Sequence, residues 1–385
     1  MDGRKTGGSK RPLAKKVAFT ETRGGPGIKT GYRFMTHRKL IEAGAEKGSI
    51  PGEDRDLALL LHELATASVG RYDYVLSSTP EFSRWFLSRP GMSEDTCFVA
   101  LASGKIVSSI LLTVTPILFS GELMRAGLID SVMTHPDHRR RGLARELLNR
   151  AVACMAELQL DLSLLYTVAE SMPYHFYASL GYRDSVRVQL LKREAVSIEK
   201  AGRRDWRASG PSETKSEEGF SSLAGDPAPW REVLDRAFHG HGSYIPMTEE
   251  LWKWRRQNRP SSAPVDVYTL GESHRNPATF ASSRVWVRKG GEPLAVTVIS
   301  DVAVQGRAFD RELVECIMSV LLPDRAVLVF CPEVNEGEID AYTEAGFAPV
   351  SVEACMIKPL SESGVQSLQS KPALWYTVTE SVVGV

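Results

Sequence analysis

Apolar residues recur along the chain in two patterns, and their order predicts an α/β fold. Alternating or continuous apolar runs of four to eleven residues predict strands, while apolar positions three and four apart predict amphipathic helices. The strands expected in the first half are 31–35, 97–101, 106–114, 123–133, 163–168 and 186–191, the last of which closes a first unit. The helices expected there are 57–64, 82–87 and 143–158.

The same succession returns in the C-terminal half in a degenerate form. The hairpin around Gly291 matches the hairpin around Gly104, 187 positions earlier, and Tyr342 matches Tyr177, 165 positions earlier. The second copy is therefore expected to be about 22 residues shorter between these points. Helix 311–322 and strand 326–330 complete it. We predict two α/β units in tandem.

Composition shifts divide the chain. The expected parts are a basic arm without packed structure at 1–28, a first unit at 29–195, a linker at 196–228, a second unit at 229–362 and a tail at 363–385. The arm and the linker are rich in Lys, Arg, Gly and Ser, which bury too little apolar surface to offset the entropy of ordering.

Charge and cysteine usage narrow the class of protein. Lys+Arg and Asp+Glu both number 47, so no global field favours nucleic acid or an anionic membrane as partner. The longest apolar stretch, 106–119, is interrupted by Ser, Thr and Pro, and the N-terminus lacks the apolar core of a signal peptide. Five dispersed cysteines suggest reduced thiols. We expect a cytoplasmic protein, with a homodimer left open.

The most informative stretch runs from Ile129 to Leu148, where a strand, a basic turn and a helix follow one another. The first N–H groups of a helix are unpaired and lie at the positive end of its dipole. Gly142 lets a ligand approach this backbone, and the arginines at 139–141 add positive charge. These residues predict an anion-binding turn without naming the anion.

A family resemblance names it. Pro136-x-x-Arg139-x-x-Gly142-x-Ala144 resembles the cofactor motif of GNAT-type acyl-CoA N-acyltransferases, and the segment 174–182 resembles their second signature. The resemblance implies acetyl-CoA as co-substrate, with its pyrophosphate on the turn and its thioester along the strand. The cofactor-binding residues so implied are Val132, Met133, Thr134, Arg139, Arg140, Arg141, Gly142, Leu143, Ala144 and Arg145. Gln305-Gly306-Arg307-Ala308 is a poor remnant of this motif, so the second unit is expected to have lost the site.

The resemblance also assigns catalytic roles. Tyr177 matches the tyrosine that protonates the leaving sulfur, which suits a phenol that is protonated at neutral pH. Asp130, in an otherwise apolar strand, is either the base or a buried ion-pair partner. Glu170 is the second candidate base, and a water chain or the C-terminal carboxylate of Val385 also stays open. His135, Asp137 and His138 lack a further ligand cluster, so no metal is expected.

The implied function is an acetyl-CoA-dependent N-acetyltransferase that acetylates a primary amine of a small molecule. The tandem arrangement resembles mycothiol-synthase-like proteins and Eis-like aminoglycoside acetyltransferases. The alternatives are a protein or peptide N-acetyltransferase and a non-catalytic acyl-CoA-binding regulatory protein. The aromatic helix 82–87 packs in the core or walls the acceptor pocket. The segment Trp252–Arg256 is expected to bury its tryptophans and expose its Lys and Arg side chains.

Overall fold

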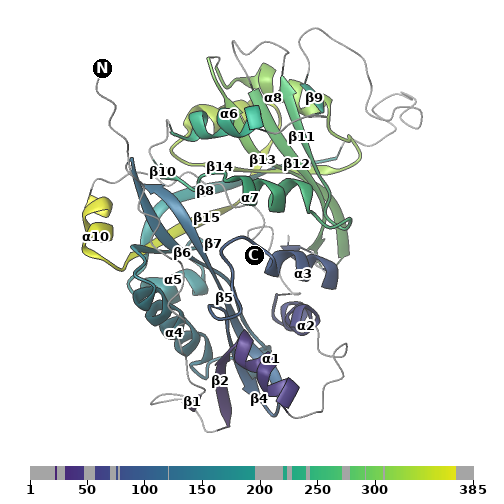
Figure 1. Ribbon diagram of the computed structural model, residues 1–385. Coiled ribbons are helices and arrows are strands. Elements are labelled where there is room, and N and C mark those ends of the chain that lie inside the picture. The colour runs from purple at the N-terminus through teal and green to yellow at the C-terminus, as the bar shows by residue number, and fades with distance from the viewer. Residues whose placement is uncertain are drawn as a thin grey trace.

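The computed structural model of the protein describes most of both halves of the chain (Figure 1). The described residues are 22–23, 31–46, 57–69, 75–76, 79–119, 121–195, 220–222, 228–239, 243–270, 278–290, 292–306 and 308–369. Nearly all of the expected arm at 1–28, most of the linker at 196–228 and the tail beyond Gln369, with Val385, lie outside this part of the chain.

The strands of the described chain join in one mixed sheet, which confirms the predicted α/β class. The order along the sheet is β1-β2-β4-β5-β6-β7-β15-β8-β14-β13-β12-β11-β9. The strands of the first half are β1 (Thr22–Arg23), β2 (Tyr32–Thr36), β3 (Val75–Leu76), β4 (Phe98–Ala102), β5 (Lys105–Phe119), β6 (Glu122–Thr134), β7 (Leu162–Val168) and β8 (Arg183–Arg193). Those of the second half are β9 (Phe220–Ser222), β10 (Ser243–Tyr244), β11 (Val265–Leu270), β12 (Ala278–Lys289), β13 (Glu292–Val304), β14 (Ala326–Pro332) and β15 (Ala348–Pro359).

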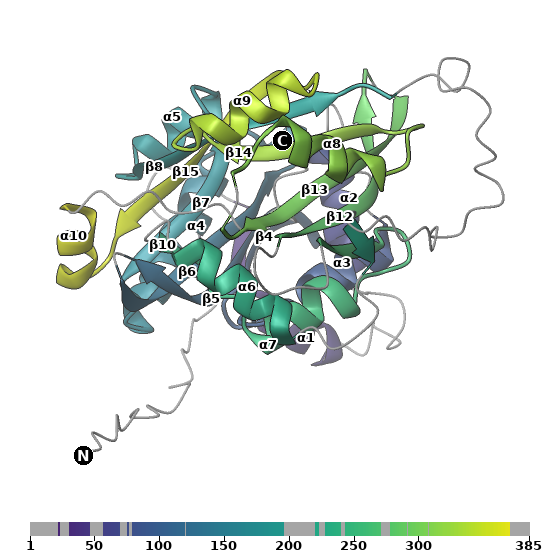
Figure 2. The same ribbon diagram turned by 90° about the horizontal axis from the view of Figure 1, so that it is seen from above.

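Helices cover both faces of the sheet (Figures 1 and 2). Those of the first half are α1 (His37–Glu46), α2 (Leu57–Val69), α3 (Pro80–Leu87), the short 3₁₀ turn η1 (Pro136–His138), α4 (Leu143–Glu157) and α5 (Met172–Ala178). Those of the second half are α6 (Ala228–His239), α7 (Glu249–Trp252), the π-helical turn η2 (Lys253–Gln257), α8 (Arg311–Ser319), α9 (Glu336–Glu344) and α10 (Glu362–Gln369). No helix in the described part of the chain is long and apolar enough to cross a membrane.

Equivalent strands of the two halves lie at equal distances from the centre of the sheet. At the centre, the last strands of the two halves, β8 and β15, have exchanged places. Strand β8 does not close the first unit, as 186–191 was expected to do, because it pairs antiparallel with β15 and β14 of the second half. Strand β15 in turn pairs with β7 of the first half. Each half therefore gives its last strand to the other, and the two halves share one continuous sheet.

The strand pairing also corrects the expected alignment of the two copies. Strand β13 pairs parallel with β14, just as β6 pairs parallel with β7, so the β12–β13 hairpin corresponds to β5–β6 and not to β4–β5. Ala126 and Val296, which begin these parallel pairs, are 170 positions apart, and their partners Leu162 and Ala326 are 164 apart. The second copy is thus six residues shorter across the turn and helix, and the expected 22 was wrong.

The two faces of the first-half sheet hold separate cores, because successive residues of a strand point to opposite sides. Leu128 and Leu164 belong to the core under α2 and α3, which extends across the centre of the sheet into the second half. Ile129 and Leu165 belong to the core under α4 and α5. We call these the α3 face and the α4 face.

A stacked tryptophan pair joins the halves on the α3 face. The rings of Trp85 and Trp254 lie 4.2 Å apart at an interplanar angle of 4°. Each indole N–H donates to the backbone carbonyl of the other residue, at 3.0 Å from Trp85 and 2.8 Å from Trp254. Arg259 lies over the Trp85 ring and Arg89 over the Trp254 ring, at 4.5 and 4.9 Å. Each tryptophan lies in a helical segment that begins after a threonine N-cap, which is Thr79 for Trp85 and Thr248 for Trp254. The two segments therefore correspond to each other in the two copies.

The prediction for Trp252–Arg256 was only half correct. Both tryptophans are buried and Lys253 is exposed, but Arg255 and Arg256 are buried as well. The wider winding of η2 turns three consecutive residues, 254–256, toward the sheet. Both guanidinium groups pair there with Asp301, a residue of β13 with a φ of 51°. This counter-charge is what permits two arginines in the core.

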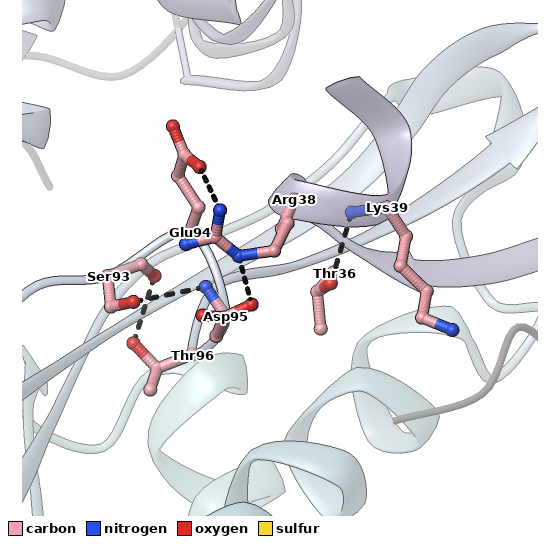
Figure 3. Close-up of polar contacts among 7 residues, drawn as sticks. All are labelled: Thr36, Arg38, Lys39, Ser93, Glu94, Asp95 and Thr96. Carbon is pink, nitrogen blue, oxygen red and sulfur yellow. Dashed lines mark hydrogen bonds and ion pairs between the residues drawn. The ribbon is translucent and has the colours of Figure 1, made fainter. Parts of the chain in front are cut away.

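Helix α1 is held to the loop before β4 by an exposed ion-pair cluster (Figure 3). Arg38 Nε donates to Asp95 Oδ1 at 2.6 Å, and its Nη1 lies 3.5 Å from Glu94. Ser93 Oγ accepts from the backbone N–H of Asp95, which fixes the loop. The side chains are about half exposed, so these pairs position α1 more than they stabilise the fold.

The tryptophan stack predicts strong coupling between the halves. Trp85→Ala and Trp254→Ala should each lower the free energy of unfolding by about 3–5 kcal/mol, because each opens a large cavity. The double variant should lose less than the sum, by about 1 kcal/mol or more, since either substitution already destroys the stack. Urea unfolding measures all three. Trp286→Ala, at a half-exposed indole, is the control and should cost far less. Additive losses would show that the stack carries no coupling.

Candidate active site at the opening between β6 and β7

The site is built where β6 and β7 separate. The two strands pair only through Ala126–Leu128 and Leu162–Leu164, although β6 continues to Thr134 and β7 to Val168. The β5–β6 register shifts between Ser109 and Leu111, and Ser131 has a φ of 48°. A bulge of this kind bends the strand and increases its twist. It thereby leaves one edge of β6 without a strand partner from residue 129 onward in the described structure.

The predicted strand residues Val132, Met133 and Thr134 lie along this open stretch. Ser108 of β5 secures it from the other side, because its hydroxyl donates to the carbonyl of Met133 at 2.7 Å and meets the Thr134 hydroxyl at 2.8 Å. The Met133 side chain is buried, and Val132 packs against the α4-face core. The backbone edge that faces the opening can therefore pair with an extended ligand.

Two of the three arginines of the turn brace it. Arg139 donates to the carbonyls of Thr134 and Ser68, at 3.2 and 2.6 Å. Arg141 donates to the Tyr32 hydroxyl at 2.9 Å and to the Asp137 carbonyl at 2.8 Å. Arg140 is exposed and has a φ of 57°. The turn is thus held to α2 and β2 and still presents positive charge.

Helix α4 begins without a side-chain cap. Gly142, at a φ of 81°, is its N-cap residue and has no side chain that could bond to the N–H groups of the first turn. The Leu143 side chain is buried in the α4-face core, and the next residue, Ala144, has only a methyl side chain. Arg145 lies over the Phe176 ring at 5.5 Å. This helix start has the open N–H groups and the positive dipole end that bind phosphates.

The corresponding helix of the second half is closed to an anion. Asp310 caps α8 with its own side chain, which accepts from the backbone N–H of Leu313 at 2.9 Å. Its carboxylate occupies a donor that a phosphate would need and repels negative charge. This geometry supports the expectation that the second copy lost the anion site.

Tyr177 lies in α5 beside the opening, within the same core cluster as Val132. Helix α5 begins at Ser171, whose hydroxyl accepts from the backbone N–H of Tyr174, and continues to Ala178. Burial raises the pKa of the Tyr177 phenol above its ordinary value, and Tyr182 and Asp130 add to the shift. The phenol is therefore protonated at neutral pH and suited to donate a proton. Its counterpart Tyr342 is fully buried, and its hydroxyl has no hydrogen-bond partner in the described structure.

Asp130 takes the ion-pair role that the sequence left open. Its Oδ2 accepts from Arg89 Nη1 at 3.0 Å, with both side chains buried, and its Oδ1 accepts from the Ser131 backbone N–H at 2.8 Å. Arg89 is itself held over the rings of Phe86 and Trp254. Both oxygens of Asp130 are engaged, so it is poorly placed to take a proton from a substrate. The aromatic residues of helix 82–87 are buried in the α3-face core, and their part in an acceptor pocket stays a prediction.

Glu170 lies apart from the other candidates. Its side chain is 60% exposed and pairs with Arg187 at 2.7 Å on the surface. A φ of 57° turns the chain there at the end of β7. Among the described residues no group of three His, Cys, Asp or Glu side chains is arranged to hold a metal ion.

Sequence reasoning missed Arg89 and Glu353. Arg89 follows α3, and no sequence pattern links it to Asp130, its ion-pair partner 41 positions away. Glu353 lies in β15, between β7 and β8, and its side chain is buried. The sequence signal that could have found Glu353 is the one used for Asp130, which is a carboxyl side chain within a largely apolar strand. The strand exchange that brings β15 to the first half was not visible in the sequence.

Comparison with known proteins agrees with this geometry. A family model described as an acetyltransferase (GNAT) domain matches residues 66–184, which include the open strands, the turn and Tyr177. This part of the chain is therefore similar to GNAT acetyltransferase domains. A search of curated proteins gave no match.

Solved structures share the fold over most of the chain. Saccharomyces cerevisiae N-myristoyltransferase with bound myristoyl-CoA aligns with a TM-score of 0.59 at 13% identity, covering 89% of this chain and 84% of that one. A GCN5-related N-acetyltransferase from Anabaena variabilis aligns at 0.54 and 14%, covering 86% and 74%. A probable N-acyltransferase from Enterococcus faecalis aligns at 0.52 and 13%, covering 88% and 74%. At these identities the likeness establishes the shared fold.

The uncapped start of α4 predicts how CoA binding can be blocked. Gly142→Asp should weaken the binding of CoA, because a carboxylate beside the open N–H groups repels the pyrophosphate. Gly142→Asn is the matched control, since it tolerates the same backbone and has a similar size without charge. Calorimetry with CoA should show the Asp variant about tenfold weaker than the Asn variant, a difference that salt reduces. Equal affinities would place the pyrophosphate elsewhere.

Proposed function

We propose that the protein is an acetyl-CoA-dependent N-acetyltransferase that acetylates a primary amine of a small molecule. The observation that carries the proposal is the continuity of three features: the open edge of β6, the uncapped start of α4 and the protonated Tyr177 beside them. They fit the three parts of an acyl-CoA in order, which are the pantetheine with its thioester, the pyrophosphate and the leaving sulfur.

A short acyl group suits the closed end of the opening. Leu128 and Leu164 are buried where β6 and β7 meet, and so are their neighbours on the opposite face. A Cβ at Gly127 would lie 2.6 Å from the sulfur of Met155 and 2.9 Å from Leu112, so the packing there leaves no spare volume. This packing supports acetyl over a long chain as the group transferred.

The acceptor side supports a small amine. Asp130, on the α3 face of β6, is bonded by Arg89, and Arg89 lies over Phe86 of the first half and Trp254 of the second. Buried side chains from both halves at this point favour a small acceptor over a protein surface. Five free cysteines are consistent with action in the cytoplasm, which is part of the proposal.

The reaction needs a neutral amine and a proton for the leaving group. The amine nitrogen attacks the thioester carbonyl, whose developing oxyanion needs a donor such as the open backbone N–H groups of β6. As the C–S bond breaks, Tyr177 donates its proton to the sulfur and regains one from the amine nitrogen.

The experiment that tests this function is CoA-thiol release against a panel of amines, amino acids, aminoglycosides and peptides, with acetyl-CoA and myristoyl-CoA as donors. We expect release from acetyl-CoA with a small amine. Release with peptides, or only from myristoyl-CoA, would instead favour an N-acyltransferase that modifies peptides. Binding of acetyl-CoA without turnover would favour a regulatory protein.

Tyr177→Phe should lower kcat by roughly 10²-fold or more, because the sulfur then leaves without a proton donor. The affinity for acetyl-CoA should stay within about twofold, since the phenol acts on the leaving group more than on binding. Tyr342→Phe is the matched control, because it removes a buried hydroxyl with no hydrogen-bond partner in the described structure. It should leave the rate unchanged. An undiminished rate in Tyr177→Phe would remove the tyrosine from the mechanism.

A further inference from the structure

The structure leaves the first half without an available base. Asp130 has both oxygens engaged, one of them by Arg89, and Glu170 pairs with Arg187 at the surface. An amine that is protonated in solution must still lose a proton before it attacks. A third carboxyl near the opening, Glu353, differs from both.

Glu353 lies one strand away from the opening, with β7 between them, on the face that carries Asp130. Strand β15 pairs with β7 so that Glu353 is opposite Val168, the last residue of β7. Cys355, two residues on, belongs to the α3-face core, so Glu353 points to the same side of the sheet. Tyr166 of β7 packs against that core too. Glu353 is thus one strand spacing, about 4.8 Å, from the strand that borders the opening.

One oxygen of its carboxyl is buried without a hydrogen-bond partner in the described structure. Glu353 is 2% exposed, and its Oε2 has no hydrogen-bond partner in the described structure. The flanking positions on the neighbouring strands, Val168 and Val188, are apolar. An unpaired carboxyl of this kind costs free energy unless a ligand supplies the missing partner.

The charged groups on this face leave Glu353 free for such a ligand. Arg89 is paired with Asp130, and Arg255 and Arg256 from η2 are paired with Asp301. Burial raises the pKa of Cys355 to about 12 and that of Tyr166 well above its usual range, so both stay neutral. Burial alone raises the pKa of Glu353 to about 8. Its ionised form, whose fraction grows as the pH approaches 8, can take a proton from an ammonium.

We propose that Glu353, delivered by the exchanged strand of the second half, binds the ammonium group of the acceptor and accepts its proton. The inference rests on the proposed acetyltransferase function. The ammonium gives one proton to the carboxylate, and the neutral amine forms the C–N bond to the thioester carbon. The second proton leaves the nitrogen through Tyr177 to the sulfur as the C–S bond breaks. Glu353 returns its proton to solvent after the product leaves.

The test is the pH profile of Glu353→Gln in the full chain with acetyl-CoA and the acceptor that gives turnover. We expect kcat/KM to fall about 100-fold at pH 7.5 and the loss to shrink below about tenfold near pH 10, where the free amine needs no base. Acetyl-CoA affinity should stay within twofold of the wild type. A loss equal at every pH would mean a structural role, and a rate within twofold of wild type throughout would overturn the proposal.

Glu338→Gln is the matched control. Glu338 is another buried carboxyl, with its pKa raised to about 7, but it lies in α9 of the second half and accepts from Asn335. Its replacement should leave the rate and its pH profile unchanged. Turnover by the wild type with an unaffected Glu353→Gln variant would overturn this inference alone, while a wild type without turnover would overturn the acetyltransferase function as well.

A stability measurement tests the unpaired state of Glu353 without activity. Because its folded-state pKa lies above the ordinary value near 4.5, the neutral carboxyl contributes stability at low pH that is lost as the pH rises through about 8. The melting temperature of Glu353→Gln relative to wild type should therefore rise between pH 5 and pH 9. A constant difference would mean that the carboxyl already has a partner, which would overturn the proposal.

Discussion

The site depends on the contact between Trp85 and Trp254. Their stack and reciprocal hydrogen bonds fix α3 against η2, and Arg89, which follows α3, lies over Trp254. Arg89 in turn holds Asp130, the carboxyl next to the bulge that opens β6 from β7. A buried carboxylate without this partner would cost several kcal/mol. The opening between the strands is therefore stabilised from the other half of the chain, through aromatic stacking and one ion pair.

The two copies have kept the same scaffold and diverged at a few positions that decide the chemistry. Both central strands carry a residue at positive φ beside a shift in pairing register, Ser131 in β6 and Asp301 in β13. In the first copy the following helix begins at an uncapped glycine, whereas in the second Asp310 caps it. In the second copy two buried arginines pair with Asp301, next to the shift in pairing register. The helix start of the first copy is left open, whereas a carboxylate occupies that of the second.

Local signals in the sequence predicted many of the strands and helices and the helix start after Gly142, but not α1, β11 or β15. Gly142 and the arginines beside it predicted an anion-binding helix start, because that feature depends on consecutive residues. The alignment of the copies was wrong because one hairpin resembles another, and only the parallel pairing of β6 with β7 and of β13 with β14 distinguishes them. The burial of Arg255 required a π-helical turn and a distant aspartate. Long-range pairing of charges has no local pattern.

The exchange of β8 and β15 gives the second copy a role although its own helix start is closed. An isolated first unit, 29–195, would leave β7 without the partner that β15 supplies and β8 without both of its neighbours. Exposed apolar edges of this length are unstable in water. The halves therefore share one sheet, and β15 is held against β7, one strand away from the opening. A carboxyl on the exchanged strand can serve chemistry whose other parts lie more than 170 positions earlier in the chain.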